Sequence, residues 1–179
     1  TLALQGQLEP DQSRWKYMLN GSMNAVDHAA LLGVWPLRFK QKLRKWLSEN
    51  IHDITINDLN LAVRSNEDKA PDVYADFQFQ DLEMRFMKTM PVIKEGRGLA
   101  TYKDNQFLIG AEGGYVEADQ GGRIDISGTG LEVSDTTIKQ SPAVVRLVAQ
   151  GPVTAALSLL NRPPLSVMDK AKLPVDLAR

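Results

Sequence analysis

From Asp53 onward, hydrophobic residues recur at every second position, the period of a β-strand with one buried face. The alternation reverses its phase three times: across Asn57-Asp58, across Gln80-Asp81 and across Gly128-Thr129-Gly130. One extra residue in a strand reverses the face that its side chains occupy, which is the effect of a β-bulge or a bend. Three strands that each bend predict a sheet folded along a line, a trough. The alternating positions are Ile54, Ile56, Leu59, Leu61 and Val63, then Val73, Ala75, Phe77, Phe79, Leu82, Met84 and Phe86, and finally Ile124, Ile126, Leu131 and Val133.

Short turns separate these strands. Asp104-Asn105 lies between two apolar segments and predicts a tight hairpin. Gly113-Gly114 and Gln120-Gly121-Gly122 are further turn candidates. Consecutive strands joined by short turns predict an antiparallel sheet.

The first fifty residues have a helical pattern. Phe39, Leu43, Trp46 and Leu47 form an apolar stripe at helical spacing, with cations on the other side. Further on, Pro152 fits the first turn of a helix that the prolines at 163 and 164 would end. We expect helices near 25–32, with Asn24 or Asp27 at the start, and near 37–49 and 152–160.

These elements predict an α+β fold: a bent, taco-like antiparallel β-sheet of about six strands that forms a hydrophobic groove, with flanking helices. The chain begins without methionine, and both of its ends have strand-like patterns, so we expect a piece of a longer, repetitive protein. Residues 1–23 would then be the end of a preceding repeat and a connector, 24–165 the groove domain, and 166–179 a connector and the start of a following strand.

Composition narrows the function. Hydrophobic residues make up 43% of the chain and charged residues 24%, which favours a folded core over disorder. The net charge of -1 gives no reason to expect a nucleic-acid partner. The chain has no cysteine, so disulfides, thiolate catalysis and cysteine metal sites are all excluded. No apolar run reaches the roughly 20 residues that span a bilayer.

Candidate chemistry is sparse. Neither His28 nor His52 has a second ligand at a metal-binding spacing, so we expect no metal. Gly128-Thr129-Gly130 opens no helix and is no dinucleotide motif, so we expect no cofactor. The carboxylates at 83, 119, 125 and 132 occupy polar positions of the alternation, which a solvated outer face explains. We therefore predict that the chain is not an enzyme and has no catalytic residue.

Several segments follow one another in a recognisable order over residues 24–165. They are Val34-Trp35-Pro36, Lys45-Trp46-Leu47 and the Ile/Leu strand after it, Phe77–Phe86 with Met90-Pro91-Val92, Gly98-Leu99-Ala100 with Asn105–Ile109, and Gly151-Pro152-Val153 through Leu165. Their order resembles a YhdP-type domain of the AsmA-like superfamily of envelope proteins.

The resemblance implies a protein anchored in the inner membrane of a Gram-negative cell and projecting into the periplasm. It implies a non-catalytic segment that passes phospholipid acyl chains between inner and outer membranes along a β-groove. Its partners would be phospholipid or another acyl lipid, adjacent repeats of the same chain, and membranes at the ends of the full-length protein. The alternative is a periplasmic assembly factor that binds outer-membrane proteins by β-strand addition at a free edge.

Two features of the sequence can be interpreted in two ways. The apolar strand face is either a closed core or a groove open to acyl chains, and the residues alone favour the core whereas the resemblance favours the groove. The groove candidates are Phe77, Phe79, Leu82, Met84, Ile124, Ile126, Leu131 and Val133, with Gln78, Glu83, Asp125 and Glu132 as outward neighbours. The basic helix either docks on the sheet, which we favour, or contacts anionic headgroups through Arg38, Lys42, Arg44 and Lys45.

Overall fold

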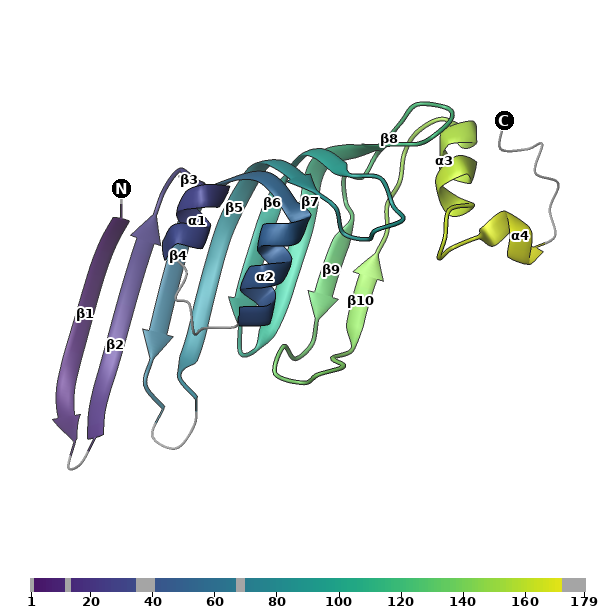
Figure 1. The fold of residues 1–179 in the computed structure, drawn as a ribbon. Coiled ribbons are helices and arrows are strands. Elements are labelled where there is room, and N and C mark those ends of the chain that lie inside the picture. Colours follow the sequence, from purple (N-terminus) through teal and green to yellow (C-terminus); the bar gives the residue numbers. More distant parts are fainter. Residues whose placement is uncertain (1, 12–13, 35–40, 67–69, 172–179) are drawn as a thin grey trace.

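The computed structural model describes residues 2–11, 14–34, 41–66 and 70–171, and within them it forms one open antiparallel sheet with four short helices (Figure 1). Eight strands follow one another in the order β1-β2-β4-β5-β6-β7-β9-β10, while β3 pairs with β4 and β8 pairs with β7. The strands are β1 (Leu2–Asp11), β2 (Arg14–Met23), β3 (Val26–Asp27), β4 (Ile51–Arg64), β5 (Asp72–Met84), β6 (Ile93–Lys103), β7 (Gln106–Glu117), β8 (Arg123–Asp125), β9 (Gly130–Val133) and β10 (Ala143–Arg146), and the helices are α1 (His28–Val34), α2 (Gln41–Asn50), α3 (Val153–Leu160) and α4 (Val167–Ala171).

The antiparallel sheet is confirmed, but the expected six strands are wrong, because the described residues form ten. The helical interpretation of the first fifty residues is also wrong for residues 2–23. These form the hairpin β1–β2, and β2 pairs with β4, so the segment expected to be a connector belongs to the same sheet. Its side chains alternate in the strand sense, with Leu2, Leu4 and Leu8 on one side.

The helices lie close to their expected positions. The carboxylate of Asp27 accepts a hydrogen bond of 2.7 Å from the backbone N–H of Ala30, so Asp27 caps the start of α1. The expected helix at 37–49 corresponds to α2, whereas residues 35–40 lie outside the described residues. α3 spans the residues predicted for it. α4 was not predicted.

All three predicted phase reversals are confirmed as breaks in the strands. Asp58 has φ 50°, and the β4–β5 register shifts beside it, between Asn57 and Asn60. Asp81 has φ 55°, and the β5–β6 register shifts between Phe79 and Leu82. Gly128, with φ 87°, separates β8 from β9. Each break inserts residues that restore the apolar side chains to one face.

The breaks continue through further strands. The turn predicted at Gly113-Gly114 is wrong, because both glycines lie inside β7, where Gly114 (φ 129°) interrupts the strand instead. Ala25 (φ 54°) separates β2 from β3, and Glu95 (φ 50°) interrupts β6. One side chain joins the breaks at residues 25 and 58: Asn24 Oδ1 accepts hydrogen bonds from the backbone N–H groups of Ala25 and Asp58, at 3.0 and 3.2 Å. We call this line of breaks, at residues 25, 58, 81, 95, 114 and 128, the crease.

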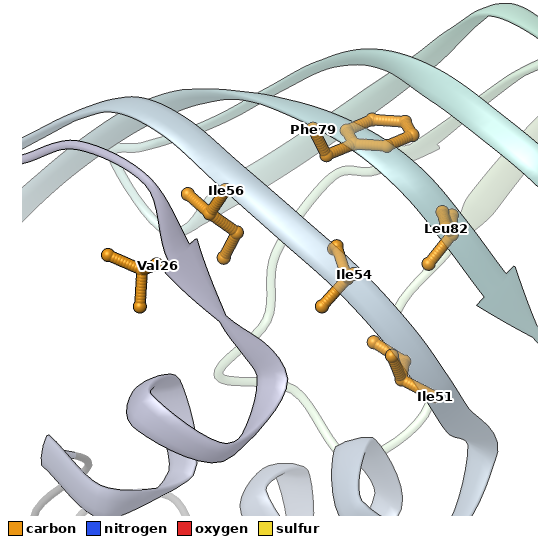
Figure 2. Packing of buried hydrophobic residues seen from close by; sticks show 6 residues of the cluster. All are labelled: Val26, Ile51, Ile54, Ile56, Phe79 and Leu82. Carbon is orange, nitrogen blue, oxygen red and sulfur yellow. The ribbon is translucent and has the colours of Figure 1, made fainter.

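Two apolar cores lie on one face of the sheet, which we call the helix face. Figure 2 shows the buried residues of the first core on β3, β4 and β5. Leu31 of α1 and Leu47 of α2 pack against this core. In the second core, α3 packs on β7 and β8. Each large aliphatic side chain buried in this way contributes about 1.5–3 kcal/mol. The buried members are Val26, Ile51, Ile54, Ile56, Phe79 and Leu82 in the first core, and Val116, Ile124, Ile126 and Ala155 in the second.

Arg162 holds the end of α3 in place. Its guanidinium donates two hydrogen bonds of 2.8 Å to the carboxylate of Asp119, in the turn between β7 and β8. It donates a third, of 3.1 Å, to the backbone oxygen of Thr89, in the segment between β5 and β6. Such a two-pronged pair fixes geometry as well as adding energy. α3 is therefore tied to the part of the sheet that lies on the same side of the crease as the helices.

Candidate functional site

Six of the eight predicted groove residues can be assigned to the helix face by strand register alone, because directly paired residues point to the same side of a sheet. Met84 pairs with Ile93, which pairs with Val116 and then Ile124. Leu131 pairs with Ile109 and Val133 with Phe107. Phe77 and Phe79 pair with Ala100 and Gly98 of β6. Leu82 and Ile126 belong to the two cores of the same face.

The eight residues differ in accessibility. Phe79 is 4% exposed in the first core, and Ile124 is 1% exposed in the second; Leu82 and Ile126 are buried in the same two cores. These four side chains are covered by the protein itself. The other four candidates, Phe77, Met84, Leu131 and Val133, are only half-buried.

The uncovered part of the helix face lies on the other side of the crease from the helices' main contacts. Two rows of side chains cross the sheet there, and we call them the open strip. Neither row contains a charged residue. The first row is Leu4, Gly21, Leu61, Ala75, Tyr102, Phe107, Val133 and Ala143, and the second is Leu2, Met23, Leu59, Phe77, Ala100, Ile109, Leu131 and Val145.

Large aliphatic side chains in the open strip face solvent. Leu4 is 71% exposed and Leu61 is 38% exposed. The hydroxyl of Tyr102 is the one hydrogen-bonding side-chain group in the two rows, and it is occupied: it donates to Asn105 Oδ1 at 3.1 Å and lies 3.3 Å from Thr136 Oγ1. A contiguous apolar surface of this kind marks an interaction site in folded proteins.

The face of the sheet that points away from the helices, the outer face, is polar on the helix side of the crease. Lys94 donates a 3.0 Å hydrogen bond to Glu117, and Arg123 lies 3.5 Å from the same carboxylate and 4.1 Å from the ring centre of Tyr115. The hydrogen bond from Lys94 is the main reason that the pKa of Glu117 is lowered. Hydrogen bonds from Ser127 lower the pKa of Asp125. The predicted outward residues Gln78, Glu83, Asp125 and Glu132 have this outward register.

The sequence prediction did not include the β1–β2 half of the open strip. Leu2 and Leu4 of the strip lie exposed on the helix face, and so do Leu8, Trp15 and Leu19 beyond its two rows. A period-two signal exists there, but Gly6 interrupts it in β1, and the neighbouring residues had been assigned to a helical region.

The basic helix was predicted to dock on the sheet, and Leu47 of α2 does pack against the first core. Arg44 is half-buried and donates a 3.1 Å hydrogen bond to the backbone oxygen of Leu32, so its charge is directed at α1. Lys45 is exposed and lies 3.6 Å from Glu49. Arg38 and the side chain of Lys42 lie outside the described residues. A headgroup contact by these cations stays a prediction.

The search for other chemistry concerns only the residues that the structure describes. They contain no cluster of three or more His, Asp or Glu side chains arranged to hold a metal ion. None of their helices combines the length and the apolar composition needed to cross a membrane.

Comparison of the chain with models of protein families, with curated proteins and with solved structures finds no match. The resemblance to AsmA-like proteins therefore rests on the sequence motifs alone.

Proposed function

We propose that the chain is a non-catalytic segment of a Gram-negative envelope protein that binds the acyl chains of phospholipid on its open strip. In the full-length, inner-membrane-anchored protein, the segment would pass these chains through the periplasm between the inner and outer membranes. The observation that carries the proposal is the pair of uncharged rows that crosses eight strands with large aliphatic side chains exposed.

The dimensions of the strip support an acyl chain as its occupant. Eight strands spaced about 4.8 Å apart give a strip roughly 34 Å long. The hydrocarbon layer of one bilayer leaflet is about 15 Å thick, half of the 30 Å core, so a whole acyl chain can lie along the strip. Each methylene removed from water contributes about 0.8 kcal/mol, so about ten of them outweigh the lower estimates of the cost of immobilising a ligand.

The shape of the helix face disfavours a flat protein partner. α1 and α2 stand on the same face as the strip (Figure 1). A second sheet laid over the strip would meet these helices, whereas a thin flexible chain can lie beside them. The exposed groups of the strip are also side chains, and the backbone hydrogen-bonding groups there are already used within the sheet.

A matched pair of leucines tests the proposal. Leu61 faces the strip and is 38% exposed, and Leu99 faces outward from β6 and is 49% exposed. A photo-crosslinking amino acid at Leu61 in the full-length protein should capture phospholipid, and the same amino acid at Leu99 should not. Leu61→Asp should abolish lipid capture at a second strip position, Leu131, while Leu99→Asp leaves it unchanged.

The outcome also separates the proposal from a closed core. Because Leu61 is partly exposed, the carboxylate of Leu61→Asp can stay hydrated, and we expect the domain to remain folded. Absence of lipid at both Leu61 and Leu131, in a folded protein, would refute lipid binding on the strip. Crosslinks to lipid at the buried Phe79 would show that α1 and α2 move away from the sheet.

The two sheet edges support the alternative, strand addition. β1 is a ten-residue edge strand that is exposed along nearly its whole length, and β10 exposes Val144 and Val145 on opposite faces. Unprotected edges of this kind can pair with a further strand. Binding of a strand peptide that is lost in Val144→Lys, which lies on the outer face, with lipid capture unaffected, would favour this function.

A further inference from the structure

We propose that the outer face of the sheet carries a second binding site, which takes a neutral oligosaccharide. The site is a hollow of about 520 Å³ across β1, β2, β4 and β5. Ligand sites in proteins have volumes of about 300–1,000 Å³, so the hollow has the size of a small-molecule site. It lies on the face opposite the open strip, and its ligand does not depend on the lipid function.

Strand register places the hollow on the outer face. The side chains that line it alternate with those of Leu4, Gly21 and Leu61, which belong to the open strip. Small side chains form a low floor, and amide and tyrosine side chains rise around it. The first row of lining residues is Ala3, Ser22 and Asn60, and the second is Gln5, Asn20, Ala62 and Tyr74.

Two of the amide side chains are held in place from outside the hollow. Asn20 Oδ1 accepts a 2.8 Å hydrogen bond from Arg64, which leaves the NH2 group of Asn20 to donate to a ligand. Asn60 donates from Nδ2 to Asp76 and to the backbone oxygen of Asp58, both at 3.2 Å, which leaves its Oδ1 to accept. A sugar hydroxyl both donates and accepts, so it can bond to either side chain. Because the side chains are fixed beforehand, less conformational entropy is lost on binding.

Tyr74 adds an aromatic surface at the rim of the hollow. Its side chain is 38% exposed, and a hydrogen bond to Asp76 raises the pKa of its hydroxyl. That bond holds the polar end of the side chain, and the ring offers an apolar surface to the C–H groups of a sugar. A tyrosine therefore suits a ligand that combines apolar ring faces with hydroxyl groups.

The charges beside the hollow favour a neutral ligand. The carboxylate of Asp76, next to Asn60, repels a phosphate group, and the guanidinium of Arg64, next to Asn20, repels an amine. A sugar chain presents uncharged hydroxyls along its whole length. Its rings recur at a spacing similar to that of the strands, about 4.8 Å, so successive rings can meet successive strands.

The test is titration of the isotope-labelled, purified chain with maltohexaose and, separately, with chitohexaose, followed by NMR. We expect the side-chain amide signals of Gln5, Asn20 and Asn60 to shift with at least one of these sugars. The hexasaccharide should bind about tenfold or more tightly than its monosaccharide, because a longer chain crosses more strands.

Three variants locate the site. Tyr74→Ala should weaken sugar binding about tenfold, as expected for loss of one aromatic contact. Ser22→Val narrows the hollow at an exposed strand position that suits a β-branched residue, so it should weaken binding in a folded protein. Tyr115→Ala is the matched control, because Tyr115 lies on the outer face of β7, outside the hollow, and its loss should leave binding unchanged.

The result is independent of lipid binding. Leu61→Asp changes the strip on the other face and should leave sugar binding unchanged. No amide shift at about 10 mM of either hexasaccharide, tenfold above a Kd of about 1 mM, would overturn the sugar site. Equal binding to wild type and Tyr74→Ala would also overturn it. Larger shifts of the same amides with inorganic phosphate than with the sugars would show an anion site instead.

Discussion

Asp81→Val should destabilise the protein, whereas Asp81→Gly should leave its stability nearly unchanged. Asp81 is the extra residue of β5 at the crease, where the pairing of Phe79 with Gly98 is followed directly by that of Leu82 with Gly96. The positive φ of Asp81 forms the bulge that accommodates this extra residue. If residue 81 instead joined the strand as an ordinary position, β5 would alternate strictly, and Leu82 and Met84 would point to the outer face.

The size of the effect follows from what leaves the first core. Leu82 is almost fully buried there, and losing its burial costs about 1.5–3 kcal/mol. The half-buried Met84 adds about 1 kcal/mol by the same measure. Glu83 would turn towards the core, and its desolvation costs at least about 1 kcal/mol more. Loss of the bulge with residue 81 retained would therefore cost about 3–6 kcal/mol, a large part of the roughly 5–15 kcal/mol that stabilises a domain. Asp81→Val should accordingly keep the bulge and bear the strain of a β-branched residue at positive φ, which costs about 1–2 kcal/mol.

Asp81→Gly retains the number of residues and suits the positive φ of 55°. Glycine adopts this conformation without strain but has more freedom in the unfolded chain, so the two effects largely offset each other, and we expect a change within about 1 kcal/mol. The measurement is the free energy of unfolding in urea, followed by circular dichroism. A valine variant as stable as wild type, or a glycine variant as unstable as the valine variant, would refute the role of the positive φ at residue 81 in setting the faces of β5.

Two further predictions concern the part of the sheet on the helix side of the crease. Gly121 and Gly122 both have positive φ, of 85° and 92°, but only at Gly121 would a Cβ overlap the backbone of Ala155 in α3. Urea denaturation should show a loss of about 2–4 kcal/mol for Gly121→Ala and about 1–2 kcal/mol for Gly122→Ala, and equal losses would contradict the packing of α3 on this turn. Glu117, whose pKa is lowered by the hydrogen bond from Lys94, stabilises the fold above the ordinary carboxylate pKa of about 4.3, and this contribution is lost as the pH falls through the lowered value. In melting curves over an acid pH series, Glu117→Gln should therefore lose less stability than wild type, and parallel curves would contradict the pair.

The crease could be predicted where large apolar residues flank it. At Asp58 and Asp81 such residues alternate on both sides, so one inserted residue leaves a visible change of phase. At Glu95 no such signal exists, because the strand continues with Gly96, Arg97 and Gly98, which give no apolar alternation to reverse. Those glycines answer a different requirement, since a Cβ at Gly98 would overlap the backbone oxygen of the neighbouring strand.

The number of strands could not be predicted because short and edge strands carry weak patterns. β3 has only two residues, too few for a periodic signal. β10 is apolar on both of its faces, so it does not alternate. The hairpin at Asp104-Asn105 was predicted because its turn chemistry is local: both residues adopt positive φ, of 51° and 63°, as a two-residue hairpin loop requires.

Which part of the apolar face is covered depends on contacts between distant segments. Phe79 and Leu61 belong to equally clear alternating strands, but Phe79 is buried in the first core, against which Leu31 of α1 and Leu47 of α2 pack, whereas Leu61 lies outside it and is 38% exposed. The covered part therefore supplies most of the apolar burial that stabilises the fold, while the open strip contributes less because water already reaches it. This separation makes the proposed function testable. Charges in the strip should impair lipid binding at little cost in stability, whereas Phe79→Asp would place a carboxylate in the first core and unfold the domain.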